Sequence, residues 1–122
     1  MPPAAPTAPL STPVFQILLS LVDEDLHGYA IILDVAERTG GEVRLTASTL
    51  YAAVKRLLDT AWIEELDRPR VAGDDSRRRY YRITPLGREA ARAEARRLER
   101  LTAQARAKRL IPGTRTSAKG AS

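Results

Sequence analysis

The sequence predicts a mostly α-helical domain with one small β-hairpin and a long C-terminal helix. Four segments carry apolar residues at helical spacing, and the last, Leu86 to Leu110, is rich in Ala, Arg, Glu and Leu throughout. Between the third and fourth segments lie two β-prone stretches, on either side of a polar segment with turn-forming residues. With 122 residues, of which 43% are hydrophobic, the chain can bury one core but not two.

The first helix is expected to begin at Thr12, with Thr12 as its N-cap and Pro13 at the first helical position. Residues Val14 to Val22 are apolar over most of the helix surface. A helix of this composition must be buried on more than one side. In so small a domain, the second side could be another subunit.

The second helix is expected to open at Leu26–Tyr29 and to end at Gly40–Gly41. Tyr29 is expected in the core, because it begins a row of apolar residues at helical spacing. That row continues with Ile32, Val35 and Ala36. His27 is the only histidine and the chain has no cysteine to share a metal with it, so a capping or packing role in the preceding turn is expected.

The third helix is expected from about Thr46, as N-cap, to about Thr60. One face carries an aliphatic stripe. The stripe consists of Leu50, Val54, Leu57 and Leu58. The opposite face and its flanks have no large aliphatic side chain; hydroxyl groups lie near the N-terminus and basic groups one turn later. This second face consists of Ser48, Thr49, Tyr51, Ala52, Lys55, Arg56 and Asp59.

The hairpin is predicted from Trp62–Leu66 and Arg79–Ile83, joined by a long mobile tip. Strand alternation puts Tyr80 and Tyr81 on opposite faces, but the register, and therefore which tyrosine is buried, is left open. Trp62, at the start of the first strand, is expected to be a buried strand residue.

The last helix is predicted from Leu86 to about Leu110, after the cap and proline Thr84–Pro85 and before the stop at Pro112–Gly113. At 1.5 Å per residue it would be roughly 37 Å long, more than so small a domain can cover. Part of it must therefore project. A thin apolar seam between arginine-rich faces resembles a two-helix contact. The seam consists of Ala91, Ala95, Leu98, Leu101 and Ala105.

The net charge of +5 is unevenly distributed along the chain. Residues 1–76 hold 6 Lys/Arg and 12 Asp/Glu, whereas residues 77–122 hold 14 and 3. A basic region of this kind suits an anionic partner, and nucleic acid is the commonest one. A solvated, charge-rich helix is the alternative explanation.

Several chemistries lack the residues that they require. Without cysteine and with one histidine, a thiolate metal site, a disulfide framework and a Cys-His dyad are excluded. Gly40–Gly41 lacks the Lys-Ser/Thr of a phosphate-binding loop. The apolar stretch Val14–Val22 is far shorter than the roughly 20 residues of a membrane span, and no signal peptide is recognised. We therefore expect a cytoplasmic protein that is no enzyme and needs no metal or cofactor.

The order of three helices, a hairpin and a long helix is that of a winged helix-turn-helix, whose third helix enters the DNA major groove. Four local patterns resemble the PadR family, in its order and approximate spacing. They are Leu26-His27-Gly28-Tyr29, Thr49-Leu50-Tyr51, Arg78-Arg79-Tyr80-Tyr81 and Ile83-Thr84-Pro85-Leu86-Gly87. The resemblance covers about residues 14–108. It implies a bacterial or archaeal transcriptional regulator, usually a repressor, that dimerises through its first and last helices, and the single C-terminal helix resembles the short subgroup.

The resemblance and the residue chemistry together suggest two surfaces. The DNA-binding candidates are the hydroxyl and basic residues of the third helix and the wing: Ser48, Thr49, Tyr51, Lys55, Arg56, Arg77, Arg78, Arg79 and Tyr80. The dimer-interface candidates are Phe15, Leu18, Leu19, Val22, Ala91, Ala95, Leu98, Leu101 and Ala105. For the first surface the structural alternatives are a Tyr51 that packs on the core flank, a merely solvated Lys55, and wing arginines that only discourage edge aggregation.

The expected organisation is a flexible arm at 1–11, a DNA-binding domain at 12–84, a dimerisation helix at 85–110 and a flexible tail at 111–122. The expected partners are a double-stranded DNA operator, a second copy of the chain and, as the resemblance implies, a small hydrophobic or aromatic effector. The competing function is a winged-helix protein–protein interaction module that never reads DNA. A related winged-helix family, MarR, is disfavoured by the four patterns.

Overall fold

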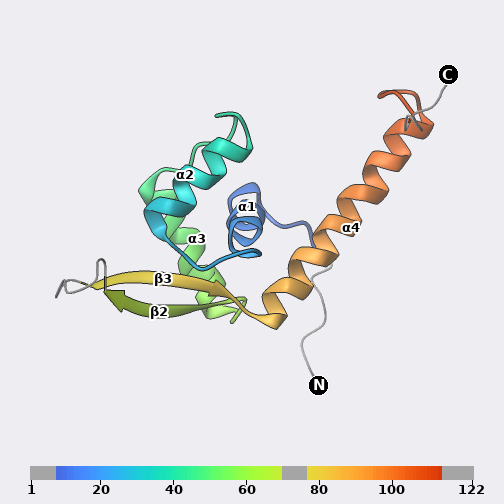
Figure 1. The fold of residues 1–122 in the computed structure, drawn as a ribbon. Helices are drawn as coiled ribbons and strands as arrows, with labels where there is room; N and C mark the ends of the chain where they lie inside the picture. Colours follow the sequence, from blue (N-terminus) through green and yellow to red (C-terminus); the bar gives the residue numbers. More distant parts are fainter. Residues whose placement is uncertain (1–7, 70–76, 114–122) are drawn as a thin grey trace.

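The computed structural model describes residues 8–69 and 77–113. Its helices are α1 (Thr12–Leu21), α2 (Gly28–Arg38), α3 (Ala47–Asp59) and α4 (Pro85–Ala107). Its strands are β1 (Leu26–His27), β2 (Ile63–Pro69) and β3 (Arg77–Ile83). The predicted mostly helical, winged helix-turn-helix architecture is confirmed (Figure 1). Most of the flexible arm expected at 1–11 and of the flexible tail expected at 111–122, namely residues 1–7 and 114–122, lies outside the described residues, as does the wing tip at 70–76.

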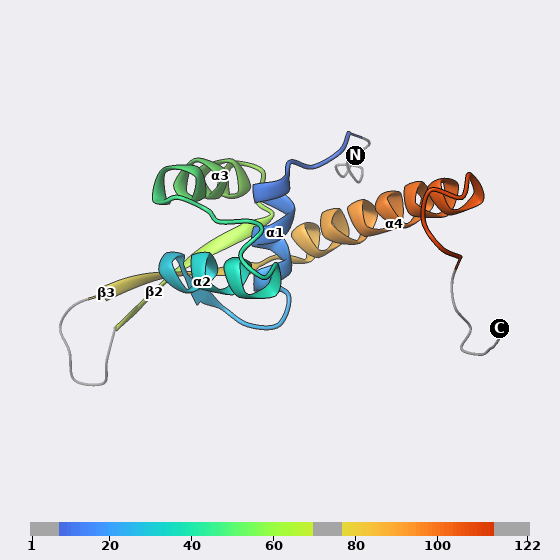
Figure 2. The ribbon, with the colours of Figure 1, turned by 90° about the horizontal axis from the view of Figure 1, so that it is seen from above.

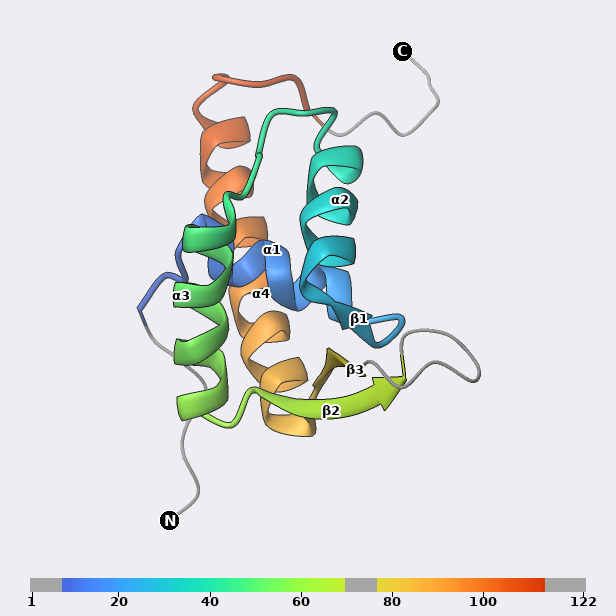
Figure 3. The ribbon, with the colours of Figure 1, turned by 90° about the vertical axis from the view of Figure 1, so that its left-hand side faces the viewer.

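Helix α1 is the centre of the fold and contacts each of the other helices as well as β3. Figure 3 shows α2 and α3 side by side, with the β2–β3 hairpin crossing below them. Helix α4 starts beside the hairpin and then runs away from the other elements (Figure 2). Part of this helix therefore projects, as its length predicts.

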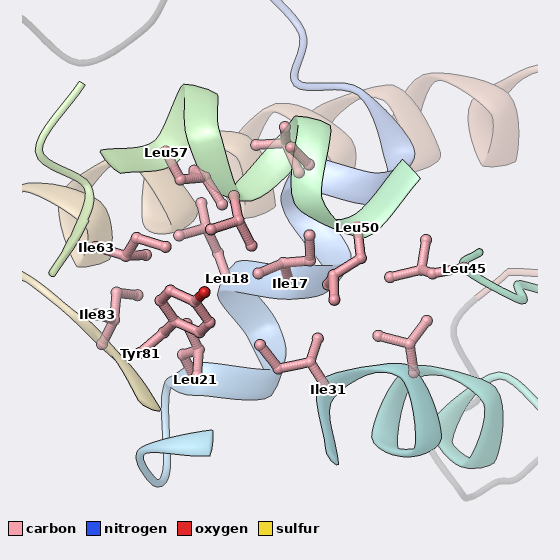
Figure 4. Packing of buried hydrophobic residues seen from close by; sticks show 14 of the residues in the cluster. Ile17, Leu18, Leu21, Ile31, Leu45, Leu50, Leu57, Ile63, Tyr81 and Ile83 are labelled. Atoms are coloured by element: carbon pink, nitrogen blue, oxygen red, sulfur yellow. The ribbon is translucent and has the colours of Figure 1, made fainter. Parts of the chain in front are cut away.

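The core is formed by Tyr81 and by aliphatic side chains from all the helices and the hairpin (Figure 4). Its largest fully buried side chains are Ile17, Leu18, Leu21, Ile31, Val35, Leu50 and Leu57. The prediction for α2 is partly wrong: Tyr29 is 64% exposed, whereas Ile31 is fully buried. The helix begins only at Gly28, and its packing against α1 and α3 turns the Ile31–Val35 edge inward. Ile32 and Ala36 lie at the edge of the core, only half-buried.

The three strands form an antiparallel sheet of order β1-β3-β2. In this register Tyr81 and Ile83 point into the core (Figure 4). Tyr80 is half-buried on the other face of β3. The short strand β1, which pairs Leu26 with Tyr81, was not predicted, because two residues carry no detectable alternation. Trp62 precedes β2 and is half-buried against the core.

A side chain caps the N-terminus of each helix, a hydroxyl in three helices and an imidazole in α2. Thr46 and Thr84 are the N-caps of α3 and α4, as predicted, and each accepts a hydrogen bond from the backbone N–H three residues on. The cap predicted for α1 is wrong by one position: Ser11 accepts from the Val14 N–H, and Thr12 is already helical. His27 caps α2 through Nδ1, which accepts from the Ala30 N–H at 3.1 Å.

The end predicted for α4 is also wrong. The helix stops at Ala107, before Pro112 and Gly113. Arg109 adopts a left-handed φ of 64°, and the Leu110 N–H donates to the Ala105 carbonyl. These are the features of a Schellman stop. Glycine is the usual sequence signal for such a stop, so an arginine at this position did not indicate one.

A second left-handed residue predicts a stabilising substitution. Ala61 has a φ of 62° at the end of α3, and its neighbour Trp62 donates its N–H to the Leu57 carbonyl. Ala61→Gly removes the Cβ strain and keeps every backbone bond, including the Ala61 carbonyl that accepts from Thr84. We expect the free energy of unfolding to rise by about 0.5–1 kcal/mol in urea titrations at fixed protein concentration. Ala52→Gly, within the exposed face of the same helix, should lower it by about 1 kcal/mol; a loss for both would contradict the strain argument.

Candidate nucleic-acid interface

Helix α3 buries its aliphatic stripe and presents the opposite face to solvent. Leu50, Val54 and Leu57 are buried as predicted, Ala53 joins them, and Leu58 is half-buried. The five DNA-binding candidates of this helix are all exposed: Ser48, Thr49, Tyr51, Lys55 and Arg56. The helix therefore offers a surface with hydroxyl and basic groups and no exposed aliphatic side chain larger than alanine.

Local contacts already engage some of these side chains. The Thr46 hydroxyl donates to the Thr49 hydroxyl at 3.0 Å and accepts from the Thr49 N–H. Lys55 pairs with Asp59 at 3.3 Å, one helical turn on, and both side chains are largely exposed. Exposed pairs of this kind contribute little to stability, so Lys55 can exchange its carboxylate for another anion.

Tyr51 and Arg56 lie on opposite flanks of α3. Arg56 and Trp62 border a groove of about 310 Å³ beside the N-terminal segment, which Leu10 and Val14 also line. Tyr51 lies on the side that faces α2 and the wing. The exposed surface of α3 thus has two distinct edges.

The wing arginines differ in their surroundings. Arg78 Nη1 lies 2.7 Å from His27 Nε2, and the half-buried Arg78 thereby links the wing to the start of α2. The His27 ring also meets the Tyr80 ring edge-on, with centroids 5.4 Å apart. Arg79 pairs with Glu65 at 3.2 Å, and its side chain is 73% exposed. For Arg77, the structure describes only the backbone within β3.

A cleft of about 460 Å³ opens where the start of α2, the Tyr51 flank of α3 and the wing meet. We call it the wing cleft. It is lined by His27, Gly28, Tyr29, Tyr51, Arg78 and Arg79. Tyr81 also borders it; burial, together with the Glu65 carboxylate, raises the pKa of the Tyr81 hydroxyl. That hydroxyl therefore stays protonated at neutral pH.

Gly28 is a residue of this cleft for which the sequence predicted no functional role. A Cβ at Gly28 would lie 2.5 Å from the Tyr51 hydroxyl and 3.0 Å from Leu50 Cδ2. The absent side chain thus makes the space in which the tyrosine lies. Gly28 and Tyr51 belong to two of the four family patterns, so the sequence did mark both residues. Their contact could not be predicted, because they lie on different helices.

The dimer-interface candidates divide into exposed and buried groups. Leu18 is fully buried and Ala91 nearly so, both within this chain's own core, so their side chains are closed to a partner. The remaining candidates are exposed or half-buried: Phe15, Leu19, Val22, Ala95, Leu98, Leu101 and Ala105. A surface on α1 and the projecting part of α4 is therefore still available.

Glu94 ties the N-terminal segment to α4. Its buried carboxylate accepts from Arg97 at 2.6 and 2.9 Å and from the Leu10 N–H at 3.4 Å. The hydrogen bonds from Arg97 hold the pKa of Glu94 below its usual range. The anchored Leu10 side chain packs against the core.

Comparison with known proteins identifies the family of this chain. Residues 17–93 match the model of the transcriptional regulator PadR-like family. The chain belongs to this family. All four sequence patterns lie inside the matched region, so the predicted resemblance is confirmed, and membership in a family of regulators confirms that the chain is no enzyme.

Solved structures of transcriptional regulators share the fold. A Clostridium thermocellum transcriptional regulator is 29% identical, with a TM-score of 0.66 over 80% of this chain and 90% of that one. A Clostridium difficile PadR family regulator is 25% identical, with a TM-score of 0.69 over 79% and 96%. Bacillus subtilis PadR, solved in complex with operator DNA, is 22% identical, with a TM-score of 0.58 over 66% and 45%, which shows a common fold.

Two sequence relatives carry no functional description. The uncharacterized protein X of Lysinibacillus sphaericus is 35% identical over 71 residues, which cover 58% of this chain and 63% of that protein. An uncharacterized 37.1 kDa protein in transposon TN4556 of Streptomyces fradiae is 34% identical over 86 residues, or 70% and 23%. The match thus spans less than two thirds of either relative.

Among residues 8–69 and 77–113, no group of three or more His, Cys, Asp or Glu residues is arranged to hold a metal ion. Within the same ranges, no helix combines the length and the apolar character that a membrane crossing requires.

Proposed function

We propose that this PadR-like chain is a transcriptional repressor that binds operator DNA through α3 and the wing. The observation that carries the proposal is the exposed face of α3, which has hydroxyl and basic side chains and continues into the arginine-bearing wing. In this fold class the corresponding helix enters the major groove, and the wing follows the adjacent backbone. Bacillus subtilis PadR, which shares the fold, has been solved with operator DNA.

The proposed functional unit is a homodimer. The projecting part of α4 presents Leu98 and Leu101 at the surface, and α1 presents Leu19. Pairing of two chains through these helices would bury the apolar seam and relate the two α3 helices by a two-fold axis. Such a dimer would contact successive major grooves of a palindromic operator, about one turn of DNA apart.

We further propose that a small hydrophobic or aromatic effector controls the regulator. The groove that Arg56, Trp62 and Leu10 border supports this, because its volume of about 310 Å³ suits a small molecule and it adjoins α3. A compound bound there would contact both the DNA-reading helix and the segment that Glu94 ties to α4.

The test is a fluorescence titration of the protein against the DNA upstream of its own gene, at two salt concentrations and with unrelated competitor DNA. We expect selective binding at two subunits per site, with an affinity that falls steeply as salt rises. Tyr51→Ala and Lys55→Ala should each weaken binding by roughly tenfold without unfolding the chain, since each removes a charge-assisted contact. Arg92→Ala, on the exposed surface of α4, is the matched control.

Binding that disappears in the presence of competitor would contradict operator recognition. The interaction-module alternative would then gain support, and the exposed Tyr29 and Leu33 side chains of α2 would be the first surface to examine. An unchanged isotherm for both α3 variants would remove these residues from the site.

A further inference from the structure

The wing cleft combines positive charge and hydroxyl groups from three separate elements. Arg78 and Arg79 come from β3, Tyr29 from the first turn of α2, and Tyr51 from α3. Among the described residues that line the cleft, none is acidic. Arg79 pairs with Glu65, on the neighbouring strand, at 3.2 Å.

The two arginines are suited to different tasks. Arg78 is half-buried and lies against His27, so its position is set by the start of α2. Arg79 is largely exposed, and its pair with Glu65 is accessible to water. Solvent-exposed ion pairs are weak, whereas a guanidinium binds a phosphate through two parallel, charge-assisted hydrogen bonds. A phosphate group can therefore compete for Arg79.

The Tyr51 hydroxyl lies directly over Gly28, at the point where α2 begins. Any side chain at position 28 would push this hydroxyl away. Gly28 therefore acts as a positioning residue: it lets a tyrosine of the DNA-reading helix reach across to the neighbouring helix, into the cleft that Arg79 also lines.

From this geometry we infer that the wing cleft is the seat of a single phosphate group of the DNA backbone, bound by Arg79 and Tyr51. The inference rests on the proposed function and adds to it a defined point of attachment. A phosphate held between α3 and the wing fixes how deeply and at what angle α3 enters the groove, because backbone contacts set register and base contacts set sequence preference.

The first experiment measures the salt dependence of binding to a short generic DNA duplex, which needs no knowledge of the operator. Each phosphate contact contributes about 0.9 to the slope of log K against log salt. Arg79→Gln is expected to lower the slope by about that amount. Arg92→Gln removes the same charge from α4, where Arg92 also pairs with a glutamate, and should leave the slope nearly unchanged. Equal slopes for the two variants would overturn the inference.

The second experiment examines the tyrosine and the glycine. Tyr51→Phe should weaken binding several-fold without changing the slope, because it removes a hydrogen bond but no charge. Gly28→Ala should cause a similar loss and have no added effect in the Tyr51→Phe background. Additive losses would mean that Gly28 does not act through the hydroxyl. Melting curves that match the parent protein would show that both variants are folded.

A third arm identifies the phosphate and its source. In a site found by footprinting, one neutral methylphosphonate linkage per half-site should weaken binding of the parent protein but not of Arg79→Gln. If the methylphosphonate weakens binding of both proteins at every position tested, the phosphate seat is contradicted and operator binding is not. Conversely, the protein could show no selective binding while Arg79→Gln still lowers the salt slope on generic DNA. That result would contradict operator recognition and leave the phosphate seat standing. Saturable shifts of the Tyr51 resonances in inorganic phosphate without DNA would assign the cleft to a free anion instead.

Discussion

Gly87→Ala is expected to destabilise the protein by about 3 kcal/mol or more, a large share of the 5–15 kcal/mol that holds a typical domain together. A Cβ at Gly87 would lie 2.0 Å from the Trp62 carbonyl oxygen and 3.0 Å from Ile83 Cγ1. The obstacle is backbone, so a change of rotamer cannot relieve it.

The same carbonyl group is needed where it is. The Trp62 oxygen accepts from the Thr84 N–H at 3.0 Å, and the Thr84 hydroxyl caps α4 by accepting from the Gly87 N–H. Moving the carbonyl would therefore loosen the joint between the hairpin and α4. The Ile83–Gly87 pattern thus has a physical explanation: it combines a buried strand end, a cap and a close approach that only glycine permits.

Urea denaturation followed by circular dichroism measures this effect. Gly113→Ala is the matched control, since a Cβ there meets nothing within 4 Å, and its unfolding midpoint should equal that of the parent protein. A Gly87→Ala midpoint within error of the control would show that the α4–hairpin joint is not the tight contact described here.

The double substitution Leu98→Gln and Leu101→Gln is expected to convert the proposed dimer into folded monomers. The two leucines are 37% and 46% exposed in the single chain, so the core does not depend on them, and glutamine is a good helix former. If pairing buries the rest of each side chain, a symmetric dimer loses about 1 kcal/mol for each of four leucines, or roughly a thousandfold in dissociation constant.

Sedimentation analysis across a range of protein concentrations checks the assembly, and the operator titration checks its consequence. Binding should weaken together with dimerisation, because one α3 helix reads only half a site. Leu33→Gln on α2 serves as the control, as it changes a leucine that is 51% exposed and lies outside the proposed interface. A double variant that remains dimeric would place the interface elsewhere.

Local patterns in the sequence were sufficient for much of this structure. The threonine caps of α3 and α4, the aliphatic stripe of α3, the hairpin and the four family patterns could all be read from residues within a few positions of one another. Such signals are reliable because capping bonds and helical faces depend on near neighbours along the chain. They were sufficient to identify the family and the exposed face of α3.

Tertiary packing decided the rest. Alternation along β3 left Tyr80 and Tyr81 equivalent, and only the sheet register and the core behind it selected Tyr81 for burial. Packing also turned Tyr29 outward, buried Leu18 within one chain, and joined His27 to Arg78, 51 residues apart in the sequence. The wing cleft depends on contacts of this kind between distant residues, because its charge, hydroxyl group and empty space come from three elements that only the folded chain brings together.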